Sequence, residues 1–183
     1  MENYQKLIAQ CEDEINELDT ELKQTLEHRD KSPHQREQWH RAADAFRNHQ
    51  SQIDDLIDQC LELGLENNNE LRRFAFAYID QDPYFYRSGY ILESLLRRVK
   101  KLSLTASEKS SIQRLVLKRI ETRALRNFRQ ICRLIHMADT DGFLTEVSNR
   151  AKSTDPQVKR RAEFALAYFP FDGRKLGAGF IIK

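Results

Sequence analysis

Apolar residues recur in alternating steps of four and three through the first 63 residues, and this spacing constrains the fold more than any other feature. The first series consists of Tyr4, Ile8, Cys11, Ile15, Leu18 and Leu22. The second series consists of Trp39, Ala42, Phe46, His49, Ile53, Leu56, Cys60 and Leu63. Polar residues fill most of the positions between them. Each series is a heptad seam, which predicts an α-helix with one narrow apolar stripe.

The segment between the two series carries the signals of a short connection. Ser32 is a suitable N-cap, and Pro33 suits the first helical position behind it. Gly64 follows the last apolar residue and favours a left-handed C-cap. We therefore predict one helix from Pro33 to Leu63, and an acidic antiparallel helical hairpin over residues 1–65. Two narrow stripes cannot enclose a thick core, so the hairpin should pack on residues 66–183. A homodimer formed through the hairpin is the alternative.

Residues 66–183 predict a basic body built of several helices, so that the whole chain is all-α. The expected helices cover about residues 70–79, 84–102, 105–137, 142–152 and 155–170. The first should end before Asp82, because a residue that precedes proline is disfavoured in the α region. Thr105 and Glu108 form a capping box at the start of the third. The apolar face of this long stretch changes direction, which predicts a break near Thr122. The tail, residues 176–182, is expected to be extended.

One segment resembles a known repeat. Residues 154–166, Thr-Asp-Pro-Gln-Val-Lys-Arg-Arg-Ala-Glu-Phe-Ala-Leu, resemble the second helix of a HEAT repeat in their Asp-Pro start, their Val-Lys pair and the spacing of Ala, Ala and Leu. In that family, helix pairs stack side by side and bind partner proteins or nucleic acid on a curved face. The resemblance covers this segment only. It implies a stack of helices in the body and assigns no function.

The net charge of +2 conceals two oppositely charged halves. Residues 1–70 hold 17 acidic and 7 basic residues, a balance of −10, whereas residues 71–183 balance to +12. The candidate partner-binding residues of the acidic half are Glu14, Glu17, Asp54 and Asp58. Small acidic helical proteins, such as bacterial immunity proteins, can occupy the basic active site of a partner. By that analogy the hairpin could serve a neutralising function.

Five arginines of the basic half recur at helical spacing. They are Arg119, Arg123, Arg126, Arg129 and Arg133. On one continuous helix they would share about a third of the circumference. Guanidinium groups grip carboxylates and phosphates at two points. The stripe therefore suggests an acidic partner protein or the chain's own hairpin, a nucleic-acid backbone, or only solvent, and we favour the first.

An aromatic cluster, from Tyr84 to Tyr90, lies at the start of the helix expected over residues 84–102. Its candidate binding residues are Tyr84, Tyr86 and Arg87. Exposed rings at this place could stack on nucleic-acid bases. The interpretation that we favour is that the rings wedge between helices with their hydroxyl groups at the rim.

The sequence offers little to support catalysis. The three cysteines lie far apart among apolar residues, which suits a reduced, cytoplasmic compartment. We find no Gly-rich phosphate loop, no catalytic residues and no metal or cofactor motif, and no apolar stretch long enough for a membrane span. We therefore predict a non-enzymatic protein-interaction module, either a regulatory, neutralising or adaptor subunit. Nucleic-acid binding by the arginine stripe is the alternative.

Overall fold

A computed structural model describes residues 2–170 of the chain, and within this range all regular structure is helical. The helices are α1 (Glu2–Leu26), α2 (Pro33–Asn48), α3 (Asp54–Glu62), α4 (Asn69–Gln81), α5 (Ser88–Val99), α6 (Ala106–Glu121), α7 (Phe128–Cys132), α8 (Ile135–Ala138), α9 (Asp141–Arg150) and α10 (Pro156–Leu166). The predicted all-α class is confirmed. The tail for which we expected an extended conformation lies outside the described residues.

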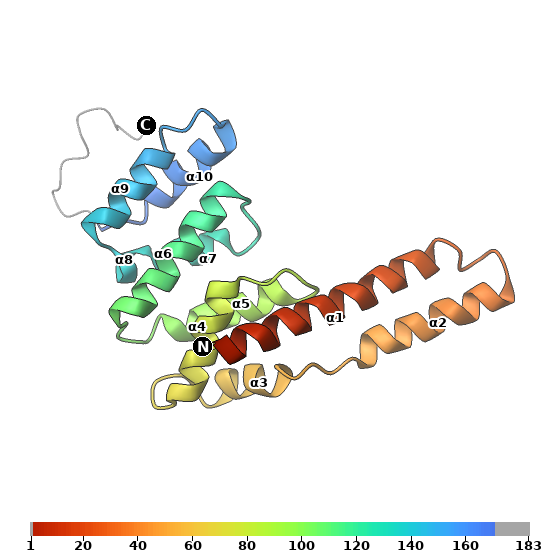
Figure 1. Cartoon of the computed structure of the whole chain (residues 1–183). Coiled ribbons are helices and arrows are strands. Elements are labelled where there is room, and N and C mark those ends of the chain that lie inside the picture. Colours follow the sequence, from red (N-terminus) through yellow and green to blue (C-terminus); the bar gives the residue numbers. More distant parts are fainter. Residues whose placement is uncertain (1, 171–183) are drawn as a thin grey trace.

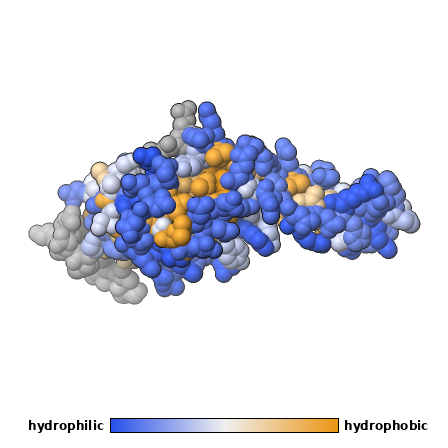
Figure 2. Space-filling view, turned by 90° about the horizontal axis from the view of Figure 1, so that it is seen from below, coloured by the Kyte–Doolittle hydropathy of each residue, from blue (hydrophilic) through white to orange (hydrophobic). Residues whose placement is uncertain are grey.

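Helices α1 and α2 form the predicted hairpin, which projects from a body made of the other helices (Figure 1). Ser32 caps α2 by accepting a hydrogen bond from the backbone N–H of Gln35. The base of the hairpin belongs to the main core, where Ile8 and Cys11 are buried together with Phe74 and Tyr78. The outer end of the hairpin is hydrophilic, and apolar side chains gather nearer its base (Figure 2). The hairpin therefore packs on the body, as the narrow seams predicted.

The prediction of one unbroken helix from Pro33 to Leu63 is wrong. Helix α2 ends at Asn48, and His49 is extended, with φ −61° and ψ 128°. The carboxylate of Asp54 accepts a hydrogen bond from the backbone N–H of Ser51 at 2.7 Å, which offers this segment an alternative to the helical pattern. The break lets α3 pack against α4 and α5 and bury Ile57. Gly64 has the expected left-handed conformation, with φ +79°.

The body is organised around α4 and α6, which pack on each other. Helix α4 is buried along most of its length, from Phe74 to Ile79. Helix α6 also contacts α7, α8, α9 and α10, and the last two pack together as a pair. Asp155 caps α10 by accepting hydrogen bonds from two backbone N–H groups, so the Asp-Pro start was interpreted correctly as a helix opener.

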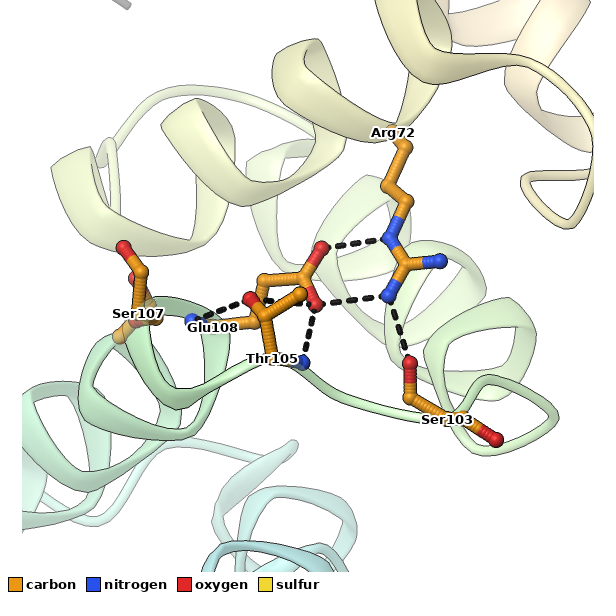
Figure 3. A network of polar contacts seen from close by, with 6 residues as sticks. Arg72, Ser103, Thr105, Ser107 and Glu108 are labelled. Atoms are coloured by element: carbon orange, nitrogen blue, oxygen red, sulfur yellow. Dashed lines mark hydrogen bonds and ion pairs between the residues drawn. The ribbon is translucent and has the colours of Figure 1, made fainter.

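A polar network fixes the start of α6 against α4 (Figure 3). The capping box of Thr105 and Glu108 is present as predicted. The same Glu108 carboxylate receives Arg72 Nε at 2.5 Å and Arg72 Nη2 at 2.7 Å. Arg72 also donates to the carbonyl oxygen of Ser103. One carboxylate therefore closes the helix end and joins the two central helices.

Three expected helices differ from the observed ones. Helix α5 begins at Ser88 and not at residue 84, because Ser88 Oγ accepts the backbone N–H of Phe85 and closes a turn there. The predicted break near Thr122 is confirmed, since α6 ends at Glu121. Helix does not simply resume after the break: a loop precedes the short helices α7 and α8. Helix α10 ends at Leu166, before the proline that we expected to end it.

Candidate functional site

The five arginines do not form one stripe, and that prediction is wrong. Arg119 is 2% exposed and pairs with Asp82 of the body, with Nη2 at 2.5 Å from Oδ1. Arg123 and Arg126 lie in the loop after α6, whereas Arg129 is on α7. The helix breaks between the first arginine and the others, so the positions no longer share one face.

The remaining arginine of the series, Arg133, caps the C-terminus of α7. It is exposed and donates to Oε1 of Gln130 at 3.1 Å. Arg129 is also exposed.

Three tyrosines of the aromatic cluster stand on the surface. Tyr84, Tyr86 and Tyr90 are 55%, 58% and 59% exposed. Phe85, which lies between Tyr84 and Tyr86, is buried and anchors the loop in the core. Our expectation that the rings wedge between helices is therefore wrong for the tyrosines. Tyr86 reaches back to the hairpin through an edge contact with Phe46, with 5.3 Å between ring centroids.

An arginine lies over the ring of each exposed tyrosine. The guanidinium carbon of Arg123 is 3.9 Å from the ring centroid of Tyr84, and that of Arg126 is 4.8 Å from the centroid of Tyr90. Arg87 lies 5.5 Å from the centroid of Tyr86. These are cation–π contacts. We call the six residues the Tyr–Arg surface: Tyr84, Tyr86, Arg87, Tyr90, Arg123 and Arg126.

The backbone beneath this surface is held by the hairpin. Glu12 on α1 accepts a hydrogen bond from the backbone N–H of Tyr84 at 2.8 Å, and Asn16 donates to the carbonyl oxygen of Tyr84 at 3.0 Å. Sequence reasoning did not find Glu12 or Asn16, because they lie far from the aromatic cluster in the chain. No local signal marks such a contact.

Two residues in or next to the surface have left-handed backbone conformations. Asp82, the C-cap of α4, has φ +50°, and Arg87 has φ +72°, a value that residues other than Gly, Asn and Asp rarely adopt. Asp82 is fixed by its ion pair with Arg119 and by Lys118 Nζ at 3.3 Å. Strained residues of this kind concentrate at binding sites.

A hollow of about 230 Å³ opens beside Tyr84 and Tyr90. Its walls are mostly apolar, and its lining also includes Arg119 and Asn127, two polar residues that are 2% and 3% exposed. Among the described residues, Nε and Nη1 of Arg119 and both polar atoms of the Asn127 amide have no hydrogen-bond partner. Neither residue would be recognised as part of a hollow from sequence.

The acidic candidates fall into two pairs. Asp54 and Asp58 are exposed and line a second hollow, of about 520 Å³, together with Tyr86 and Arg87. The structure therefore brings these two aspartates to one edge of the Tyr–Arg surface, and leaves Glu14 and Glu17 on α1.

The two candidate glutamates on α1 occupy ordinary surface positions. Glu14 lies 3.6 Å from Nε2 of His49, and Glu17 is exposed.

Within the described part of the chain, no group of three or more His, Cys, Asp or Glu side chains is placed to hold a metal ion. None of the helices described is long and apolar enough to cross a membrane. The three cysteines are buried. Burial raises the pKa of the Cys132 thiol to about 12, so this sulfur stays protonated at neutral pH.

The chain matches no known protein-family model, no curated protein and no solved structure. The HEAT-like interpretation of residues 154–166 therefore stays a prediction.

Proposed function

We propose that this chain is a non-enzymatic protein-interaction module that binds an acidic partner protein through the Tyr–Arg surface. The observation that carries the proposal is the clustering of three exposed tyrosines with three arginines on residues 84–90 and 123–126, with Tyr84 held by α1 of the hairpin. Tyrosine and arginine are enriched among the residues that dominate binding energy in protein interfaces. A regulatory, neutralising or adaptor subunit that works in the cytoplasm is the role we infer for such a module.

The stacking of arginine on tyrosine prepares both residues for a partner. A guanidinium that already lies over a ring loses less side-chain freedom on binding than a free one. A guanidinium over a ring face can still donate the N–H groups of its edge to a carboxylate. Arg126 is held twice, because Nη1 also donates to the hydroxyl of Tyr90 at 2.6 Å. The surface therefore favours planar anionic groups such as Asp and Glu side chains.

The fixed backbone supports the same conclusion. Tyr84 is bonded through both its N–H and its carbonyl oxygen to α1, and Phe85 is buried beside it. A loop that is ordered before binding avoids part of the entropy loss of association. The strained Arg87 is consistent with a conformation kept for binding.

Nucleic-acid binding is the second candidate, and the exposed tyrosine rings support it because bases stack on such rings. One feature argues for the protein partner: Arg123 already covers one face of the Tyr84 ring, which leaves less of this ring for a base to stack on.

Affinity purification with quantitative mass spectrometry tests the proposal. The test variant reverses charge at the surface, Arg123→Glu with Arg126→Glu. The matched control, Arg36→Glu with Arg41→Glu, changes the net charge equally at exposed positions on α2. We expect an acidic protein to be retained by wild type and control and to bind the test variant about 30-fold more weakly or worse, since a hot-spot arginine contributes about 2 kcal/mol.

Two outcomes would contradict the proposal. Equal recovery of every partner by the test and control variants would exclude the surface as the binding face. Co-purification of nucleic acid, lost in the test variant and released steeply by salt, would instead support the second candidate.

A further inference from the structure

The amide of Asn127 is placed where it could cap a helix and does not do so. Asn127 is the N-cap residue of α7, and asparagine is favoured there because its side chain can accept a backbone N–H. In this structure the side chain makes no capping bond. Both polar atoms of the amide are buried without a partner among the described residues. A buried amide without a partner destabilises a fold, and a ligand that bonds to it would remove this cost.

Arg119 also lines this hollow, and part of its guanidinium group has no hydrogen-bond partner among the described residues. Its Nη2 is used by Asp82, but Nε and Nη1 have no partner among the described residues. Asp82 is also shared with Lys118, so one carboxylate faces two cations. The positive charge that remains favours an anionic ligand over a neutral one.

The walls of the hollow are apolar. They include the rings of Tyr84 and Tyr90 and the side chains of Pro83, Leu92 and Leu125. Glu93, the acidic residue in the lining, is already paired with Arg97 at 2.6 Å. A ligand that fits has a short apolar stem and a charged acceptor at its end.

A glutamate side chain has this form, with two methylene groups and a carboxylate. We propose that the hollow, which we call the Arg119 pocket, binds the carboxylate of a glutamate side chain on the acidic partner. The inference rests on the proposed function and adds to it the residue type that anchors the partner. In this arrangement Arg119 and the Nδ2 group of Asn127 donate to the carboxylate, and Arg126 stands at the mouth with Tyr90.

Nuclear magnetic resonance of the full chain, titrated with small probes, tests this pocket. The probes are N-acetyl-glutamate amide, N-acetyl-glutamine amide and N-acetyl-glycine, which carries the free carboxylate of a chain end. The signals to follow are the side-chain amide of Asn127 and Nε–H of Arg119. We expect the glutamate probe to shift both signals saturably, and the glutamine probe to bind about tenfold more weakly or not at all.

Two substitutions of Asn127 separate binding from folding. Asn127→Ala should weaken the glutamate probe about tenfold, the loss expected for one hydrogen bond to a charged group, and should leave thermal stability unchanged or raised because no bond of the folded chain is lost. Asn127→Asp has the same shape and should abolish binding by charge repulsion. Arg36→Glu, far out on α2, should leave probe binding unchanged.

Several results would overturn the inference. Equal binding of the glutamine probe would exclude the carboxylate, and the absence of any saturable shift would mean that the hollow holds only water. Tighter binding of N-acetyl-glycine would assign the pocket to a chain terminus and not to a glutamate side chain.

The failure of this inference is distinguishable from the failure of the proposed function. A partner that is lost with the charge-reversed arginines but bound normally by Asn127→Ala would leave the Tyr–Arg surface standing and refute the pocket. If the glutamate probe binds but no partner is lost with Arg123→Glu and Arg126→Glu, the pocket stands and the proposed function is refuted.

Discussion

Replacing Glu108 with Gln should lower the free energy of unfolding by about 2 kcal/mol at neutral pH. The carboxylate accepts two bonds from Arg72 and one from the backbone N–H of Thr105 (Figure 3). A glutamine oxygen can keep the Thr105 bond, but its NH2 group cannot accept from the guanidinium. The substitution removes a charge-assisted hydrogen bond, which stabilises a fold by about 1.5–3 kcal/mol. The partial exposure of Arg72 keeps the expected effect below the top of this range.

The same substitution has a defined pH dependence. Burial by itself raises the pKa of Glu108, but the hydrogen bonds from Arg72 and Thr105 outweigh it, so the pKa lies below its usual value. A carboxyl with a lowered pKa stabilises the fold above its unfolded pKa, about 4.3, and this contribution is lost as the pH falls through the folded pKa. The difference between wild type and Glu108→Gln should therefore be full at pH 7 and shrink towards zero in acid.

Urea unfolding followed by circular dichroism at pH 7, 5 and 3 measures this difference. The control is Glu37→Gln, which removes an exposed pair with Arg41 and should change stability by less than about 0.5 kcal/mol. The reasoning is refuted if Glu108→Gln costs no more than the control at pH 7, or if its effect is the same at pH 3.

Three further predictions concern the interior. Arg119→Met leaves the buried Asp82 without its closest partner and should lower the free energy of unfolding in urea by about 3–5 kcal/mol. Adding Asp82→Asn should restore part of this loss. A loss below about 1 kcal/mol, as for an exposed ion pair, would contradict the burial of the pair. Gly89→Ala should raise the free energy of unfolding by about 0.5–1 kcal/mol, and with it the melting temperature, because Ala favours helix. Its Cβ would lie 4.0 Å from Asn127 Nδ2, which is an ordinary contact. A lowered melting temperature would show that the hollow has no room for the added methyl group. The cysteines should react with a thiol reagent only when the chain unfolds, since burial raises the pKa of Cys132 to about 12, and rapid labelling of the native protein at neutral pH would be inconsistent with this.

Features governed by local chemistry could be predicted from the sequence. The capping box at Thr105, the left-handed Gly64 and the helix end before Pro83 depend on residues a few positions apart, and all three are confirmed. The packing of the hairpin on the body followed from the width of its apolar seams. The break at His49 was not predicted, because the apolar spacing continues through it. The bond from Ser51 N–H to Asp54 and the contacts of α3 with α4 and α5 favour the bend.

The site was harder to predict than the fold. A helical projection of the arginines assumes one continuous helix, and the loop after α6 removes that condition. The burial of Arg119 depends on Asp82, and the exposure of Tyr84 depends on Glu12, each of which is remote in sequence. Residue type suggested tyrosine and arginine as binding candidates, and tertiary contacts decided which of them share a surface.

Hydrogen–deuterium exchange on the isolated complex tests the central claim most directly. It compares the free chain with the chain bound to the acidic partner recovered by affinity purification. The account predicts new protection of backbone amides in residues 83–90 and 122–127, the two segments that carry the Tyr–Arg surface. Protection confined to the acidic residues 1–65, with both segments unchanged, would contradict the account and assign binding to the acidic face.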